Sequence, residues 1–274
     1  MNGMVLGSLG NAYISLGQYD KAIEHHNQAL AIAREIGDRR GEGIRLGNLG
    51  SAYDSLGQYD KAIEHHNQAL AISREIGDRQ GEGSILGNLG SVYYSLGQYD
   101  KAIEHHNQAL VIAREIGNRQ FEDSALGNLG IAYSSLGQYD KAIEHHNQAL
   151  AISRKIGNRQ GEGSDLCNLG SAYLHGLDDA ASALPLLIGS VAVFDDIWNG
   201  LKTDRDRITF GDVDGPTLSN RWLQIAHARL DNPQAALETA ERARSRAFEL
   251  LLAEQRLKHS PQQGGGDDDG AAAA

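Results

Sequence analysis

The chain has 274 residues, 41% of them hydrophobic, which is enough to build the core of one array or of two small globular domains. Its 25 Lys and Arg against 36 Asp and Glu give a net charge of −11, which argues against binding nucleic acid through phosphate contacts. The single cysteine, Cys167, excludes a disulfide framework and an all-cysteine metal site, and it suits a reducing compartment.

No targeting segment is evident. The first residues, MNGMVLGSLG, contain no basic region and no sustained apolar run, so they do not predict a secretory signal. No stretch approaches the roughly 20 apolar residues that a membrane-spanning helix needs. We therefore expect a soluble, cytoplasmic protein that binds neither membranes nor nucleic acid.

One segment of the sequence recurs without change at a period of forty residues. It is SLGQYDKAIEHHNQAL, at residues 15–30, 55–70, 95–110 and 135–150. Self-similarity at a fixed period of this size indicates a repeat array. Because one repeat cannot bury its own apolar face, neighbouring repeats must stack, which predicts an elongated solenoid with a continuous concave surface.

Each unit is predicted to be two helices joined by a tight turn, as residues 41–80 illustrate. Leu46, Leu49 and Tyr53 lie on one face of a first helix, at spacings of three and four residues. Gly57 closes that helix because glycine accepts the left-handed conformation without strain, and Asp60 suits the first turn of the next helix.

The second helix keeps the same period and has its own stop signal. Its apolar and small positions are Ala62, Ile63, His66, Ala69, Leu70 and Ser73. Gly77 ends this helix, and Asp78 is expected to cap the first helix of the next unit. The two-residue period of a strand is absent from the sequence.

These residues resemble the tetratricopeptide repeat, whose pattern is a large apolar residue, Leu-Gly, Tyr, Ala and an aromatic residue at set offsets. Here the positions are occupied by Leu46, Leu49-Gly50, Tyr53, Ala62 and His66. His66 replaces the usual aromatic residue, and the closing proline is absent, so AISREIGDR lengthens the second helix. Such forty-residue units are similar to those of the kinesin light chains and of the Leu-Gly-Asn G-protein-signalling modulators.

The resemblance implies an all-α fold, a right-handed superhelix of helix-turn-helix units that has no enzymatic activity, cofactor or metal. Its expected function is to bind a segment of a protein partner in the concave groove. We divide the chain into five units, a degenerate sixth unit and a disordered low-complexity tail. Their ranges are 1–40, 41–80, 81–120, 121–160 and 161–200 for the units, 201–258 for the sixth unit and 259–274 for the tail.

The pattern decays after residue 170. The turn of the fifth unit has one inserted residue, and Pro185 is expected near the first turn of the helix that follows. Residues 201–215 predict a loop or short helix. Two further helices are expected at Leu218–Leu230 and at Pro233–Lys258, as a pair that caps the stack.

A row of asparagines is the candidate binding site. By resemblance, this face of the first helices lines the groove, where an amide offers a donor and an acceptor to the main chain of a bound peptide. The alternative is that these amides tie adjacent first helices together. The row consists of Asn48, Asn88, Asn128 and Asn168, and the glycines beside it, Gly47, Gly87 and Gly127, leave room for a ligand.

Specificity is expected from groove positions that vary between units. They form two rows, Ser51, Ser91, Ile131 and Ser171, and Asp54, Tyr94, Ser134 and Leu174. The arginine that the related modulators carry early in the first helix is replaced by Ile44, Ser84, Ser124 and Ser164. This mixed, weakly acidic groove favours a neutral or basic segment over an acidic one.

Other reactive side chains predict structure rather than chemistry. The histidine pairs, His25-His26, His65-His66, His105-His106 and His145-His146, are adjacent and so point about 100° apart, unlike the i, i+4 ligands of a zinc helix. They favour packing, and an inner row buried in the neutral form would loosen the array below pH ~6.5. Cys167 is expected to be a small groove residue, and Arg242, Arg244, Arg246 and Arg256 a solvated face.

A second functional class stays open. Residues 235–253 resemble the last helix before the CHAT domain, a caspase-like peptidase module that follows such arrays. In this alternative the chain is the recruiting or regulatory part of a peptidase-like protein whose catalytic domain is absent from the chain. The sequence assigns no catalytic residue to the chain itself.

Overall fold

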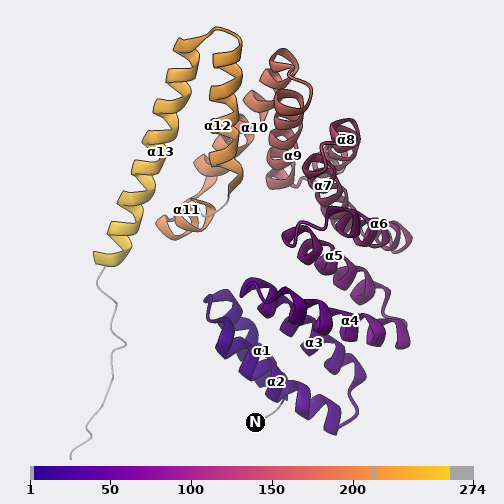
Figure 1. Cartoon of the computed structure of the whole chain (residues 1–274). Coiled ribbons are helices and arrows are strands. Elements are labelled where there is room, and N and C mark those ends of the chain that lie inside the picture. Colours follow the sequence, from indigo (N-terminus) through magenta and orange to yellow (C-terminus); the bar gives the residue numbers. More distant parts are fainter. Residues whose placement is uncertain (1–2, 212–213, 260–274) are drawn as a thin grey trace, which may run out of the picture.

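The computed structural model describes residues 3–211 and 214–259 as a succession of helices that follow an open arc (Figure 1). Consecutive helices pack as antiparallel pairs, which confirms the all-α solenoid of helix-turn-helix units. The helices are α1 (Gly3–Ser15), α2 (Tyr19–Glu35), α3 (Arg39–Ser55), α4 (Tyr59–Glu75), α5 (Arg79–Ser95), α6 (Tyr99–Glu115), α7 (Arg119–Ser135), α8 (Tyr139–Ile156), α9 (Arg159–Ser171), the π-helical η1 (Ala172–Gly176), α10 (Ala180–Gly200), α11 (Asp204–Gly211), α12 (Asp214–Arg229) and α13 (Pro233–His259).

The turns form where the glycines predict them. Gly57 has a φ of +69°, in the left-handed region that only glycine adopts without strain. The amide of Gln58 then donates to the carbonyl of Tyr53 at 2.9 Å, which closes the end of α3. At the start of α5 the Asp78 carboxylate accepts a hydrogen bond of 2.9 Å from the amide of Gly81, the expected N-cap.

Within a pair, the two helices cross closely because a glycine of the first helix faces a histidine of the second. A Cβ atom added to Gly50 would lie 2.6 Å from the ring of His66, too close for any side chain. The same contact joins Gly10 to His26, Gly90 to His106 and Gly130 to His146. These rings fill the place of the usual aromatic residue and are almost fully buried.

Charged side chains link consecutive units through a network that the sequence analysis did not identify. Glu42, at the start of α3, is 8% exposed and accepts hydrogen bonds from Arg34 at 2.8 Å and from Arg39 at 2.5 Å. Arg39 also pairs with Glu75 of the next unit. The hydrogen bond from Arg34 lowers the pKa of Glu42. The fifth unit closes the same link through Arg159 and Asp196, 3.1 Å apart.

The fifth unit accommodates its inserted residue by a local change of helix type. The chain winds into η1 after α9, and a single π turn takes up one extra residue. Asp178, with a φ of +52°, then takes the left-handed position that glycine holds elsewhere. Because α10 begins at Ala180, Pro185 lies in its second turn, and the expectation that it sits near the first turn was wrong.

The chain after α10 forms one short helix and a pair of longer helices. Residues 204–211 form the short helix α11, and α12 and α13 pack against each other, with α13 beginning at Pro233. Helix α13 continues to His259, one residue into the segment expected to be a tail. The remaining residues of that tail, 260–274, lie outside the described part of the chain.

One helix corrects the expectation that no segment is apolar enough to span a membrane. Helix α10 meets that criterion by length and composition. It packs against α9 and α12, and its Leu187, Val191 and Phe194 side chains are buried in the contact. These contacts are those of a core helix in a solenoid.

Candidate functional site

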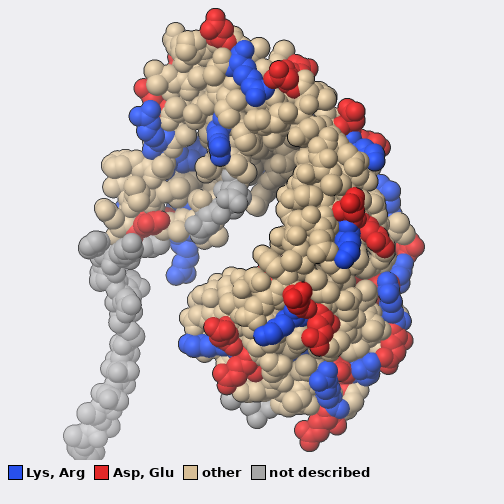
Figure 2. Space-filling model, in the orientation of Figure 1, with Lys and Arg blue, Asp and Glu red and all other residues tan. Residues whose placement is uncertain are grey.

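The concave side of the arc is the candidate site, and the first helix of each unit lines it. In Figure 1, α5 lies on the inner side and α6 on the outer side, and the near-identical units before and after repeat this arrangement. Figure 2 shows that charged side chains gather along the outer side, whereas the surface facing the hollow of the arc is mostly uncharged. A ligand on the inner side therefore meets mainly apolar and neutral polar groups.

The predicted groove residues surround a hollow of about 190 Å³ between α3 and α5, over the end of α4. Its apolar lining comes from Ile44, Ile72 and Ile85, of which Ile44 is 49% exposed. Asn48 and Asn88, from neighbouring units, both line it, together with Ser51. The structure thus brings together two of the four predicted asparagines and one of the variable positions beside a shared apolar surface.

The asparagine row divides between the two roles considered for it. Asn48 Nδ2 donates to Asn11 Oδ1 at 2.9 Å, so this amide ties α3 to α1. The side-chain amides of Asn88, Asn128 and Asn168 make no hydrogen bond to another residue in the described part of the chain. Asn88 is exposed, and Asn128 and Asn168 are half-buried. One asparagine of the row therefore ties two first helices together, and the amides of the other three remain available to a ligand.

The glycines beside the row are not needed for packing within the chain. A Cβ atom on Gly47 would meet nothing within 4 Å, and one on Gly87 would meet only Phe121, at an ordinary contact distance of 3.7 Å. Cys167, at the equivalent place in the fifth unit, is 3% exposed. It packs at Ser219 of α12, and burial raises its pKa to about 11. The prediction that Cys167 is a small groove residue was wrong, because α12 covers it.

The two variable rows contain three kinds of environment. Ser91 is exposed, Ser51 is half-buried, and each hydroxyl donates to a carbonyl of its own helix. Asp54 is half-buried, and desolvation raises its pKa. Tyr94 is held in place, because its hydroxyl lies 3.0 Å from that of Ser135.

The second variable row, which begins at Asp54, leaves the groove before Leu174, its predicted last member. Ser134 and Ser171 line a shallow hollow together with His175 and Trp222. Leu174, the last member of the row, is fully buried in the core under α10 and α12, so its assignment to the groove was wrong. The π turn that accommodates the inserted residue lies around this position.

The histidine pairs separate into a buried row and a half-buried row. Burial lowers the pKa of His26, His66 and His106 to about 4, so these rings are neutral at physiological pH. Neither ring nitrogen of His66 has a hydrogen-bond partner among the described residues. The outer rings pack on tyrosines, as His65 does on Tyr53 at 5.0 Å between ring centres. In the described residues, no three His, Cys, Asp or Glu side chains form a group that could hold a metal ion.

The fourth and fifth units each hold a buried aspartate that the sequence analysis did not single out. Asp165 is 5% exposed and lies 3.2 Å from Nδ1 of His146, and desolvation raises its pKa. Asp123 accepts hydrogen bonds from the Ser153 hydroxyl at 2.8 Å and from Nδ2 of Asn158 at 2.9 Å. Asp123 stands where the other units have glycine, and that break in the repeat was a usable signal.

Three of the four C-terminal arginines, Arg242, Arg244 and Arg256, are exposed, as expected of a solvated face, whereas Arg246 is half-buried. Arg246 and Arg242 both pair with Asp195, and Arg256 lies 3.2 Å from Asp204. Acidic side chains of α10 and α11 thus engage three of these arginines.

Comparison with known proteins agrees with this geometry. The family model of the tetratricopeptide repeat matches residues 3–75, 81–155 and 121–196, so the chain belongs to the tetratricopeptide repeat family. No curated protein sequence matches the chain.

Several solved structures share the fold at low sequence identity. BtubC (BKLC) from P. vanneervenii is 19% identical with a TM-score of 0.69, over 90% of this chain and 96% of that one. A putative kinesin light chain of Podosopora anserina with nearly identical repeats is 23% identical with a TM-score of 0.60, over 69% and 93%. A Rap protein complexed with Competence and Sporulation Factor is 19% identical with a TM-score of 0.58, over 90% and 75%. The resemblance to kinesin light chain units is thereby confirmed at the level of the fold.

Proposed function

We propose that the chain is a non-enzymatic interaction scaffold that holds an extended segment of a protein partner in its concave groove. The observation that carries the proposal is the hollow between α3 and α5, where exposed apolar surface adjoins amides of two consecutive units. The apolar lining suits a side chain of the partner, and the amides suit its main chain. The Rap protein that forms a complex with Competence and Sporulation Factor has the same fold, which agrees with a binding function.

The spacing of the units determines how many residues of a partner each unit would contact. Helices pack about 8–10 Å apart, and an extended peptide rises about 3.3 Å per residue, so one unit serves roughly three partner residues. Asn88, Asn128 and Asn168 would bond peptide groups about three residues apart, and the open glycines beside the first two, Gly87 and Gly127, would admit a close approach of the partner backbone. The mostly uncharged inner side favours a neutral or weakly basic segment.

The peptidase-linked alternative stays a prediction, because none of the observations above bears on a catalytic domain. A cytoplasmic location, expected from the single cysteine, is likewise part of the proposal.

The proposal is tested with a random twelve-residue peptide library displayed on phage. Peptides enriched on the full chain are synthesised, and their affinities are measured for the Asn88→Ala, Asn128→Ala double variant. Each lost hydrogen bond costs about 1 kcal/mol, so we expect affinities roughly 10- to 30-fold weaker with unchanged helicity.

The matched control carries Asn107→Ala and Asn147→Ala, the same changes at exposed positions of α6 and α8 in the same units. We expect this control to bind the selected peptides as the unchanged chain does. Equal loss in both double variants, or no enrichment of any peptide, contradicts groove binding.

A further inference from the structure

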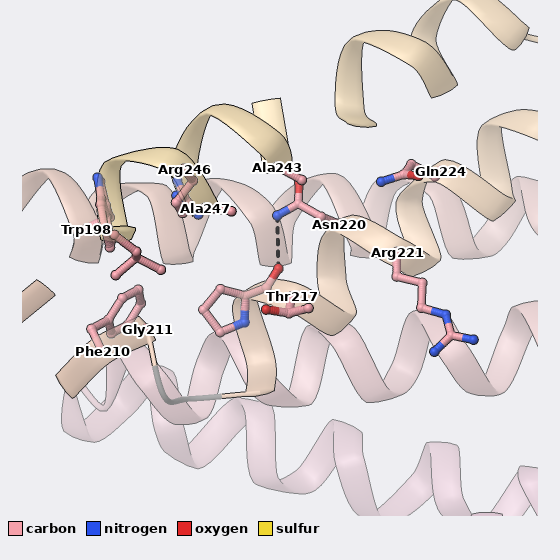
Figure 3. A pocket seen from close by; sticks show the side chains of 12 residues that line it. Trp198, Phe210, Gly211, Thr217, Asn220, Arg221, Gln224, Ala243, Arg246 and Ala247 are labelled. Carbon is pink, nitrogen blue, oxygen red and sulfur yellow. Dashed lines mark hydrogen bonds between the residues drawn. The ribbon is translucent and has the colours of Figure 1, made fainter. Parts of the chain in front are cut away.

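The C-terminal helices enclose a second hollow, which is separate from the groove (Figure 3). It measures about 330 Å³ and lies between α10, α11, α12 and α13. Trp198, Phe210 and Leu250, from three of these helices, form its apolar walls. Leu250 approaches closely because Gly211 faces it, and a Cβ atom on that glycine would lie 2.7 Å from the leucine side chain.

The walls offer aromatic surface beside one half-buried cation. The rings of Trp198 and Phe210 are 6.3 Å apart and tilted by 49°. Arg246 lies over Trp198, 5.4 Å from the ring centre, and pairs with Asp195. Arg221, the other arginine of the lining, is exposed to solvent and lies over Trp222. An uncharged ring therefore fits these walls better than an anion, since Arg246 already has its counter-ion and the charge of Arg221 is solvated.

Asn220 gives the hollow its polar specificity. Its side chain is 5% exposed, and Nδ2 donates to the carbonyl of Pro216 at 2.9 Å, which fixes the orientation of the amide. The other atom, Oδ1, is buried and accepts no hydrogen bond in the described part of the chain. A buried acceptor without a donor is unfavourable, so a ligand that supplies an N–H or O–H group gains affinity here.

The size of the hollow and the composition of the chain limit what can occupy it. Cavities of about 150 Å³ bind benzene and ligand pockets begin near 300 Å³, so this one has room for a molecule of one or two rings. Residues 1–2, 212–213 and 260–274 contain no aromatic side chain. An aromatic occupant must therefore come from another molecule.

We propose that this hollow binds a small, uncharged, planar aromatic molecule that carries one ring N–H or O–H group. The ring lies between Trp198, Phe210 and Leu250, and the N–H or O–H donates to Asn220 Oδ1. The site is independent of the groove, because the hollow between α3 and α5 shares no residue with it.

Indole and N-methylindole are the probes, since they have nearly the same shape and differ in the donor. Isothermal titration calorimetry on the full chain should show saturable binding of indole and about tenfold weaker binding of N-methylindole, a difference of about 1.4 kcal/mol. The two tryptophans, Trp198 and Trp222, give two indole N–H signals in a ¹H–¹⁵N spectrum, assigned with Trp222→Phe. Only the Trp198 signal should move on titration.

Two variants locate the site and its donor contact. Ala247→Phe, at an exposed position that lines the hollow, should abolish binding, while the control Ser245→Phe, on the same helix but outside the hollow, should not. Asn220→Leu should bring the affinity for indole down to that for N-methylindole. Absence of saturable binding, or unchanged binding in Ala247→Phe, overturns the site; equal affinities for the two probes in the unchanged chain overturn the donor contact.

Discussion

The first four units and the fifth unit differ at the point where the two helices of a pair cross. In the first four, a glycine faces a buried histidine, as Gly90 faces His106. In the fifth, Gly170 faces Leu187, whose side chain would lie 2.5 Å from an added Cβ atom. The same close crossing is therefore filled by a ring that can take up a proton in one region and by an aliphatic side chain in the other. The glycine is needed for the geometry, whereas the histidine is one of two ways to fill it.

Acidification should have the largest effect, because it destabilises the helix crossings that contain a buried histidine and not the crossing that contains Leu187. The folded pKa of His66 and of His106 is about 4, below the unfolded value of about 6.5, so their neutral forms contribute stability that is complete above pH ~6.5. That stability is lost as the pH falls from about 6.5 toward 4, and each ring costs about 2 kcal/mol by pH ~5. We expect thermal melting at pH 5 to occur well below that at pH 7.5.

Replacing His66 and His106 by leucine, the residue that fills this place in the fifth unit, measures how much of the acid sensitivity they cause. The double variant His66→Leu, His106→Leu should be at least as stable as the unchanged chain at pH 7.5, because His66 leaves both ring nitrogens unpaired. Its melting temperature should also fall much less on acidification. Equal falls in the variant and the unchanged chain would assign the acid sensitivity to other groups.

Two kinds of glycine in the first helices should respond in opposite ways to an added side chain. Gly90→Val places branched atoms where a Cβ already lies 2.5 Å from the His106 ring, so we expect a loss of about 1–3 kcal/mol in the free energy of unfolding. Chemical denaturation measures it. A variant as stable as the unchanged chain would show that the two helices separate without cost.

The groove glycines should tolerate what the crossing glycines do not. Gly47→Ala meets open space and removes a flexible residue from a helix, so we expect a gain of about 0.5–1 kcal/mol in unfolding free energy. The same change should weaken binding of groove-selected peptides. A stabilised variant with unchanged peptide affinity would show that Gly47 does not contribute to peptide binding.

The smallest expected effect concerns the charge network between units. Arg39 pairs with Glu75, Arg79 with Glu115 and Arg159 with Asp196, but Lys155 stands at the acidic position opposite Arg119. Lys155→Glu should add an exposed ion pair and raise the unfolding free energy by about 0.2–1 kcal/mol at low salt. The gain should vanish near 1 M salt, and a gain that persists there would have another cause.

The sequence alone determined the repeat, the helix pairs, the turn glycines, the N-cap at Asp78 and the place of Asp60 in the first turn of its helix. These features depend on residues a few positions apart, whose spacing and backbone preferences are visible in the chain itself. The small size of Gly50 was also predictable, because the pattern places it where two helices cross.

The tertiary structure decided what depends on helices far apart in the chain. It tied Asn48 to Asn11, covered Cys167 with α12 and buried Leu174 beneath the diverged fifth unit. It also assembled the C-terminal hollow around Asn220 from four helices whose residues share no motif. A local pattern fixes the direction of a side chain relative to its own helix, but only the packing of the neighbouring helices fixes whether it meets solvent, a partner amide or a buried wall.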